Sequence, residues 1–187
     1  MNKEPIIKVV DKFAAAEGQL LTAIDLFFRD GNQISTYTLA RAAHEILDDL
    51  CRHNGLERGV LNEGLKHLDK PAKKRIMDKV NEAKNFFKHA ANDPKNKINW
   101  NPEITIHFII DSISLYRRLT KKKDPYEIFI FYVWYRAHNP EGWPANNNFD
   151  NLMAEMKDGF AQLSKLRAYE AFRIIYENST THPDVKK

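Results

Sequence analysis

The sequence predicts an all-α protein, a bundle of about six or seven helices. Apolar residues recur at three-to-four spacing through most of the chain, and capping residues, prolines and glycines mark where these stretches begin and end. No series of alternating strands joined by Asn-Gly turns is present. With 187 residues, the chain is long enough to bury a core without disulfides or metals.

The N-terminal part predicts a pair of antiparallel helices. An apolar stripe runs from Ile6 to Phe28, and Gly31 supplies the stop after it. Ser35 or Thr36 can cap the second helix, which carries its own stripe and ends at Gly55. Because the connection is short, the two helices should form a hairpin.

A third helix is predicted after a stretch in which the apolar residues have no regular spacing. Residues 56–70 contain two glycines among scattered apolar residues, which predicts a loop with one helical turn. Pro71 suits the first position of a helix that extends through Ala90 and must end before Pro94.

The C-terminal part predicts further helices. Residues 104–119 and 128–137 each follow a proline-containing start, and their length and spacing favour helix over strand. A polar loop, residues 138–148, precedes a helical stretch, residues 149–178, with a break between 159 and 164. The segment 93–102 is the best boundary, giving a unit of residues 1–97 and a helical extension of residues 98–187, or one domain combining both.

Several classes of protein are excluded by what the sequence lacks. It has no dinucleotide-binding, P-loop, hydrolase-elbow or zinc-protease motif. The longest apolar run, residues 128–135, is too short to cross a membrane, and charges near the N-terminus argue against a signal peptide. With Cys51 as its single cysteine, the protein is expected in the reducing cytoplasm.

Two His–Asp pairs are spaced to share a helix face, His44 with Asp48 and His107 with Asp111. Such pairs arise by chance on charged helices, so we expect no metal site and no cofactor. His44 is expected to be half-buried and bonded to a neighbouring helix.

Positive charge is concentrated between Lys66 and Lys97, where ten Lys or Arg residues accompany four Asp or Glu residues. Such a surface attracts polyanions, for example RNA or an acidic protein, although charge runs also occur on ordinary solvated helices. The candidate nucleic-acid-binding residues are Lys73, Lys74, Arg75, Lys88, Lys95 and Lys97.

The segment KNFFKH, residues 84–89, holds the candidate catalytic residues Lys84, Asn85 and His89. In a helix that continues through His89, Asn85 lies one turn before it on the same face, where it can orient the imidazole ring. The same residues also suit a helix end, because cations there are stabilised by the helix dipole.

The helical hairpin followed by this segment resembles the HEPN superfamily over about residues 13–94. The resemblance implies a small α-helical bundle that dimerises and cleaves RNA without a metal. The arginine, polar and histidine positions of its motif fall on Lys84, Asn85 and His89. His89 would be the general acid or base, Lys84 would stabilise phosphorane charge, and two copies would complete each site.

Lys84 stands where active HEPN members have arginine. Lysine keeps the charge but lacks the planar, bidentate grip on phosphate, so weak or absent nuclease activity is expected. Three interpretations stay open: a HEPN-like protein that binds RNA or a protein partner, a metal-independent ribonuclease in a toxin or defence context, and an assembly subunit with no nucleic-acid role.

Overall fold

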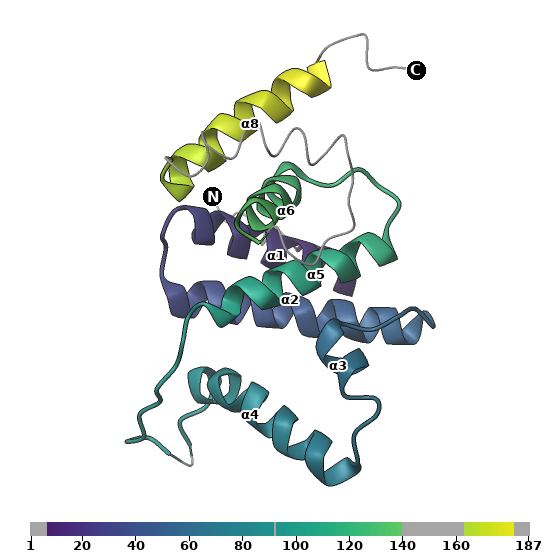
Figure 1. Cartoon of the computed structure of the whole chain (residues 1–187), viewed down its shortest axis with the longest axis vertical. Coiled ribbons are helices and arrows are strands. Elements are labelled where there is room, and N and C mark those ends of the chain that lie inside the picture. The colour runs from purple at the N-terminus through teal and green to yellow at the C-terminus, as the bar shows by residue number, and fades with distance from the viewer. Residues whose placement is uncertain (1–6, 92, 140–162, 182–187) are drawn as a thin grey trace, which may run out of the picture.

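The computed structural model describes residues 7–91, 93–139 and 163–181, and within these residues it contains seven helices and no strand. The prediction of an all-α helical bundle is therefore confirmed (Figure 1). The helices are α1 (Lys12–Phe28), α2 (Gln33–His53), α3 (Val60–Gly64), α4 (Lys70–Lys88), α5 (Ile104–Leu119), α6 (Tyr126–His138) and α8 (Lys165–Thr181).

α1 begins later than its apolar stripe predicts. The Asp11 side chain accepts a hydrogen bond from the Ala14 backbone N–H at 2.7 Å and caps the helix, so residues 7–10 precede it. Val9 in that segment is fully exposed. The apolar residues Ile7, Val9 and Val10 thus belong to no helical stripe.

The turn between α1 and α2 also differs from the prediction in detail. Asp30, rather than Gly31, adopts the left-handed conformation, with φ of 49°. The Asn32 side chain caps α2 by accepting from the Ser35 N–H at 2.9 Å, so neither Ser35 nor Thr36 is the cap. The far end of α2 follows the prediction, since Gly55 has φ of 68° just beyond it.

One apolar core joins the N-terminal and C-terminal parts of the chain. Its buried residues come from α1, α2, α5, α6 and α8, and none comes from α3 or α4. Figure 1 shows α4 at one end of the molecule and α8 at the other, with α1, α2, α5 and α6 between them. The boundary near residues 97 and 98 stays a prediction, although the units on either side of it share this core.

α4 lies against the bundle through a narrow apolar stripe. The Phe87 ring contacts those of Tyr37 and Trp100 edge to face, with centroids 5.8 and 5.1 Å apart. No residue of α4 is fully buried. The helix ends at Lys88, before the predicted end, and His89 follows in an extended conformation.

α3 is the single short helical turn predicted within residues 56–70, and α5 and α6 match their predicted positions. The loop from residue 140 onwards and the helical stretch before residue 163, with most of its predicted break, lie outside the described residues. Among the helices that the structure describes, none is both long and apolar enough to cross a membrane.

The packing of the core can be tested by truncating one of its buried side chains. Phe28 is fully buried and its ring stacks on Tyr169 with centroids 4.8 Å apart. Phe28→Ala should lower the free energy of unfolding by about 3–5 kcal/mol, because it removes these contacts and leaves a cavity. Urea denaturation followed by circular dichroism measures the change.

The control is Ile34→Ala, because Ile34 is 46% exposed on α2. Its free energy of unfolding should stay within about 0.5 kcal/mol of the wild type. Equal losses in the two variants would contradict this description of the core.

Candidate functional site

A row of ionisable side chains on α2 is buried where this helix packs against the rest of the bundle. Arg41, His44 and Asp48 occupy one face of the helix at spacings of three and four residues, and each is at most 4% exposed. Burying such groups costs free energy unless each finds a partner. Each of the three residues does so, on a different part of the chain.

His44 is bonded to α5, as predicted, but it is fully rather than half buried. Its Nε2 atom lies 2.8 Å from Asp111 Oδ2, and its Nδ1 atom lies 3.4 Å from a terminal nitrogen of Arg41. A carboxylate only accepts, so Nε2–H donates to Asp111, and the guanidinium group of Arg41 lies on the other side of the ring.

Asp48 and Asp111 hold the segment between α2 and α3. The backbone N–H of Gly59 donates to Asp48 at 2.8 Å, and that of Val60 donates to Asp111 at 3.0 Å. A Cβ atom on Gly59 would lie 2.5 Å from Asp111 Oδ2, so only glycine fits at this position. The two carboxylates thus fix the start of α3.

The carboxylate of Asp48 also accepts hydrogen bonds from side chains, chiefly from the guanidinium group of Arg58. Arg58 donates to it from Nε at 3.1 Å and from a terminal nitrogen, and Asn62 donates at 3.0 Å. Burial by itself would raise the pKa of Asp48. The hydrogen bonds from Arg58 and Gly59, together with the charge of Arg58, outweigh burial and lower it.

Arg41 connects α2 with α4. It donates to Glu45 at 3.0 Å and to Asn81 at 2.9 Å, and its guanidinium carbon lies 4.4 Å from the centroid of the Phe108 ring. Lys84 donates to the same Glu45 oxygen at 2.6 Å. These contacts are the polar attachment of α4 to the bundle.

The structure separates Lys84 from the two other predicted catalytic residues. Asn85 and His89 line a surface pocket of about 610 Å³, together with Lys97. Lys84 is not part of its lining; its side chain is 20% exposed, and its ammonium group is paired with Glu45 on α2. Within one chain, the three residues therefore do not form one site.

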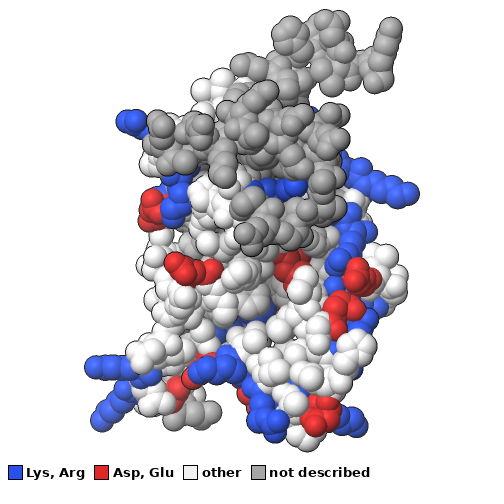
Figure 2. Space-filling model, in the orientation of Figure 1, with Lys and Arg blue, Asp and Glu red and all other residues white. Residues whose placement is uncertain are grey.

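The predicted nucleic-acid-binding cations differ in how they are paired. Lys74 forms an ion pair with Asp78. Within the described residues, no ion pair engages the other five, which are Lys73, Arg75, Lys88, Lys95 and Lys97. Lys73 is half-buried and the others are exposed. Figure 2 shows blue side chains over the part of the molecule that contains α4.

In the two His–Asp pairs predicted to share a helix face, the histidine and the aspartate are not bonded to each other. His44 bonds to Asp111 across helices, and Asp48 bonds to Arg58. Across residues 7–91, 93–139 and 163–181, no group of three or more His, Cys, Asp or Glu residues could hold a metal ion. Cys51 is buried, which raises the pKa of its thiol, so it is a poor candidate nucleophile.

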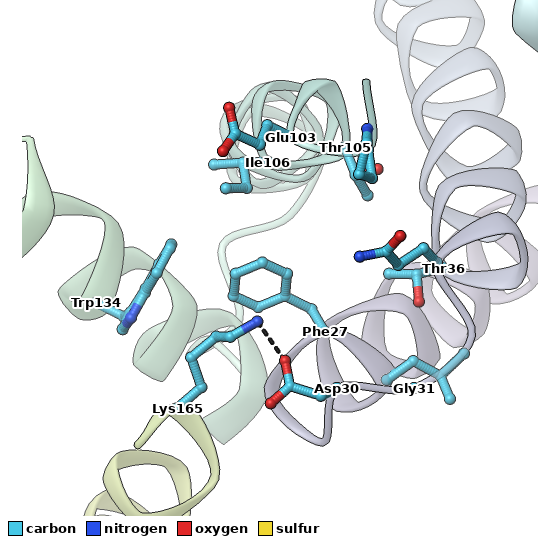
Figure 3. A pocket seen from close by; sticks show the side chains of 12 residues that line it. Phe27, Asp30, Gly31, Thr36, Glu103, Thr105, Ile106, Trp134 and Lys165 are labelled. Carbon is cyan, nitrogen blue, oxygen red and sulfur yellow. Dashed lines mark ion pairs between the residues drawn. The ribbon is translucent and has the colours of Figure 1, made fainter. Parts of the chain in front are cut away.

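Another cavity, of about 380 Å³, lies where α1, α5, α6 and the start of α8 meet (Figure 3). Lys165 reaches into it, with Nζ 2.5 Å from Asp30 and 4.6 Å from the centroid of the Phe27 ring. Trp134 forms a further wall. The ammonium group of Lys165 already lies in this cavity, and its ion pair with Asp30 helps to attach α8 to the bundle.

The sequence alone does not show that Arg41, Glu45, Asn81 and Asp111 belong to one network. The available signal was the presence of Arg41, His44 and Asp48 on the apolar face of α2, where polar residues need partners. The identity of those partners requires the tertiary structure, because Asp111 lies 67 residues from His44 and Asn81 lies 40 residues from Arg41.

The network predicts a pH-dependent contribution to stability. A carboxylate whose pKa is lowered by folding stabilises the native state above its unfolded value of about 3.9, and this contribution is lost as the pH falls through the folded value. Asp48→Asn should therefore reduce the free energy of unfolding at pH 7 by about 1–3 kcal/mol. It should also flatten the loss of stability below about pH 4.

Denaturant titrations between pH 3 and pH 7 measure both effects. Asp49→Asn is the matched control, because Asp49 is an exposed neighbour on the same helix that forms a surface ion pair with Arg52. An Asp48→Asn variant with the stability and pH profile of this control would disprove the role assigned to Asp48.

Comparisons with protein-family models, with curated proteins and with solved structures found no significant match. The resemblance to the HEPN superfamily over residues 13–94 therefore stays a prediction from the sequence.

Proposed function

We propose that this protein binds RNA through the basic surface of α4 and of the segment that follows it, with little or no nuclease activity. The observation that carries the proposal is the set of cations without an ion pair in the described structure, Lys73, Arg75, Lys88, Lys95 and Lys97. A cation that is not neutralised by a neighbouring carboxylate can bind a phosphate and release a counterion.

The placement of α4 supports this proposal. The helix is at one end of the molecule, and none of its residues is fully buried (Figure 1). Its side chains are therefore accessible along most of its length. The same region includes the acidic residues Asp78 and Glu82, but these are paired with Lys74 and Lys79.

The position of Lys84 supports the second part of the proposal. Its ammonium group is paired with Glu45, which also accepts from the buried Arg41. If Lys84 turned toward a phosphate, its ion pair with Glu45 would be lost, and Glu45 would keep only its contact with Arg41. Lysine also lacks the bidentate geometry of arginine, so stabilisation of a phosphorane should be weak.

RNA binding predicts a specific dependence on salt. Lys73→Gln, Arg75→Gln and Lys88→Gln combined should weaken the binding of single-stranded RNA. They should also reduce the slope of log K against log salt by about 2, because three phosphate contacts are lost. Fluorescence anisotropy at a series of salt concentrations measures the slope.

The matched control combines Lys121→Gln, Lys122→Gln and Lys123→Gln. These three exposed lysines lie between α5 and α6 and carry the same total charge. The control should keep the wild-type slope. Equal effects of the two triple variants would show general charge attraction, and no RNA binding by the wild type would reject the proposal.

One observation favours a second candidate function, metal-independent RNA cleavage. Asn85 and His89 line the same pocket, and Lys97 is another of its lining residues. On this alternative, the ribose 2′-oxygen attacks the adjacent phosphate and the bond from phosphorus to the 5′-oxygen breaks, leaving a 2′,3′-cyclic phosphate and a 5′-hydroxyl end. His89 either takes the proton from the 2′-hydroxyl or gives a proton to the leaving 5′-oxygen. Two copies of the chain would be needed to complete the site, as the HEPN resemblance implies.

This alternative predicts cleavage of RNA in the presence of EDTA by the wild-type protein. His89→Ala should abolish that cleavage, whereas His53→Ala, which removes another exposed histidine at the end of α2, should leave it unchanged. Gel analysis of labelled RNA measures the products. Intact RNA after incubation with folded wild-type dimer would rule out the ribonuclease.

A further inference from the structure

A cavity of about 480 Å³ lies between α5, α4 and the start of α3. Its volume is within the range of small-molecule binding sites, roughly 300–1,000 Å³. Most of its wall is apolar and comes from all three helices, namely Val60, Leu61, Val80, Ile104, Phe108 and Ile110. A few polar groups interrupt this wall, as in typical ligand sites.

The most buried of these polar groups are His44 and Asp111. Asp111 is 9% exposed, and its carboxylate receives hydrogen bonds from His44 Nε2 and from the backbone N–H of Val60. Within the described residues, the His44 ring is the one basic group within ion-pair distance of it. His107 also lines the cavity but forms no ion pair with Asp111.

The two buried carboxylates of the network therefore differ in the kind of basic group that pairs with them. Asp48 is bonded to the guanidinium group of Arg58. Asp111 is bonded to the imidazole of His44, and no Lys or Arg of the described residues lies within ion-pair distance of it. Arg41 itself is bonded to Glu45 and Asn81 and approaches Asp111 only through the imidazole ring.

Buried carboxylates in proteins are usually paired with a cation, most often Lys or Arg. Here a buried carboxylate that no Lys or Arg pairs with borders an apolar cavity that is large enough for a ligand. We propose that the cavity binds a small organic ammonium ion with an apolar body, and that Asp111 is the counter-ion of its ammonium group. This proposal is independent of RNA binding by α4.

The test uses three probes of nearly equal shape and different charge, 2-phenylethylammonium, 2-phenylethanol and phenylacetate. The ammonium ion should bind the wild-type protein at least tenfold more tightly than the alcohol, and phenylacetate should bind least. Isothermal titration calorimetry on the full chain measures the three affinities. No binding of the ammonium ion, or equal affinity for the ion and the alcohol, would overturn the proposal.

Asp111→Asn tests the counter-ion directly, because it keeps the shape of the side chain and removes its charge. Binding of the ammonium ion should fall to that of the alcohol, whereas Asp49→Asn, which removes one exposed charge from α2, should leave it unchanged. Unchanged affinity in Asp111→Asn would overturn the assignment of Asp111.

A second variant locates the ligand without altering Asp111. Val80 lines the cavity from α4 and is only partly buried, so Val80→Trp should fill the cavity without replacing a fully buried core residue. Binding of both the ammonium ion and the alcohol should be lost. Wild-type affinity in a folded Val80→Trp protein would show that the probes bind elsewhere and would overturn the proposal.

Discussion

The buried polar face of α2 is the constraint on which the rest of the structure depends. Arg41, His44 and Asp48 stand where a helix in a bundle normally presents apolar side chains, so each must find a partner as the chain folds. Their partners lie on α4, on α5 and before α3. Elements that contribute no fully buried residue to the core, α3 and α4, are thereby held at defined positions, because leaving any of these groups without a partner would be costly.

This arrangement changes the meaning of the KNFFKH segment. In isolation, Lys84, Asn85 and His89 look like neighbouring parts of one site. The structure assigns Lys84 to the attachment of α4, through Glu45, and leaves Asn85 and His89 on a different surface. A lysine suits the first task because one compact ammonium group can share a carboxylate oxygen with a guanidinium group. The same engagement keeps its charge away from a bound phosphate.

The sequence predicts the helices well because their stripes and stop residues are local signals. It predicts their ends less well, since Asn32, Ser35 and Thr36 are all suitable caps within four positions and only the folded backbone selects one. The bonding partners of the buried site residues are even harder to predict from the sequence. That His44 bonds to another helix follows from its place on an apolar face, but the choice of Asp111 depends on how α5 packs on α2. Local spacing instead suggests Asp48, which bonds to Arg58.

α4 is the element where the two proposed binding surfaces meet. Its exposed cations include Arg75 and Lys88, whereas Val80 borders the cavity beside Asp111. Both surfaces rely on the same attachments, the Lys84–Glu45–Arg41 contacts and the Phe87 stripe. An element with no fully buried residue separates from its bundle at a lower free energy than the core helices. Any ligand that binds only when α4 is attached therefore stabilises that attachment, whichever surface it uses.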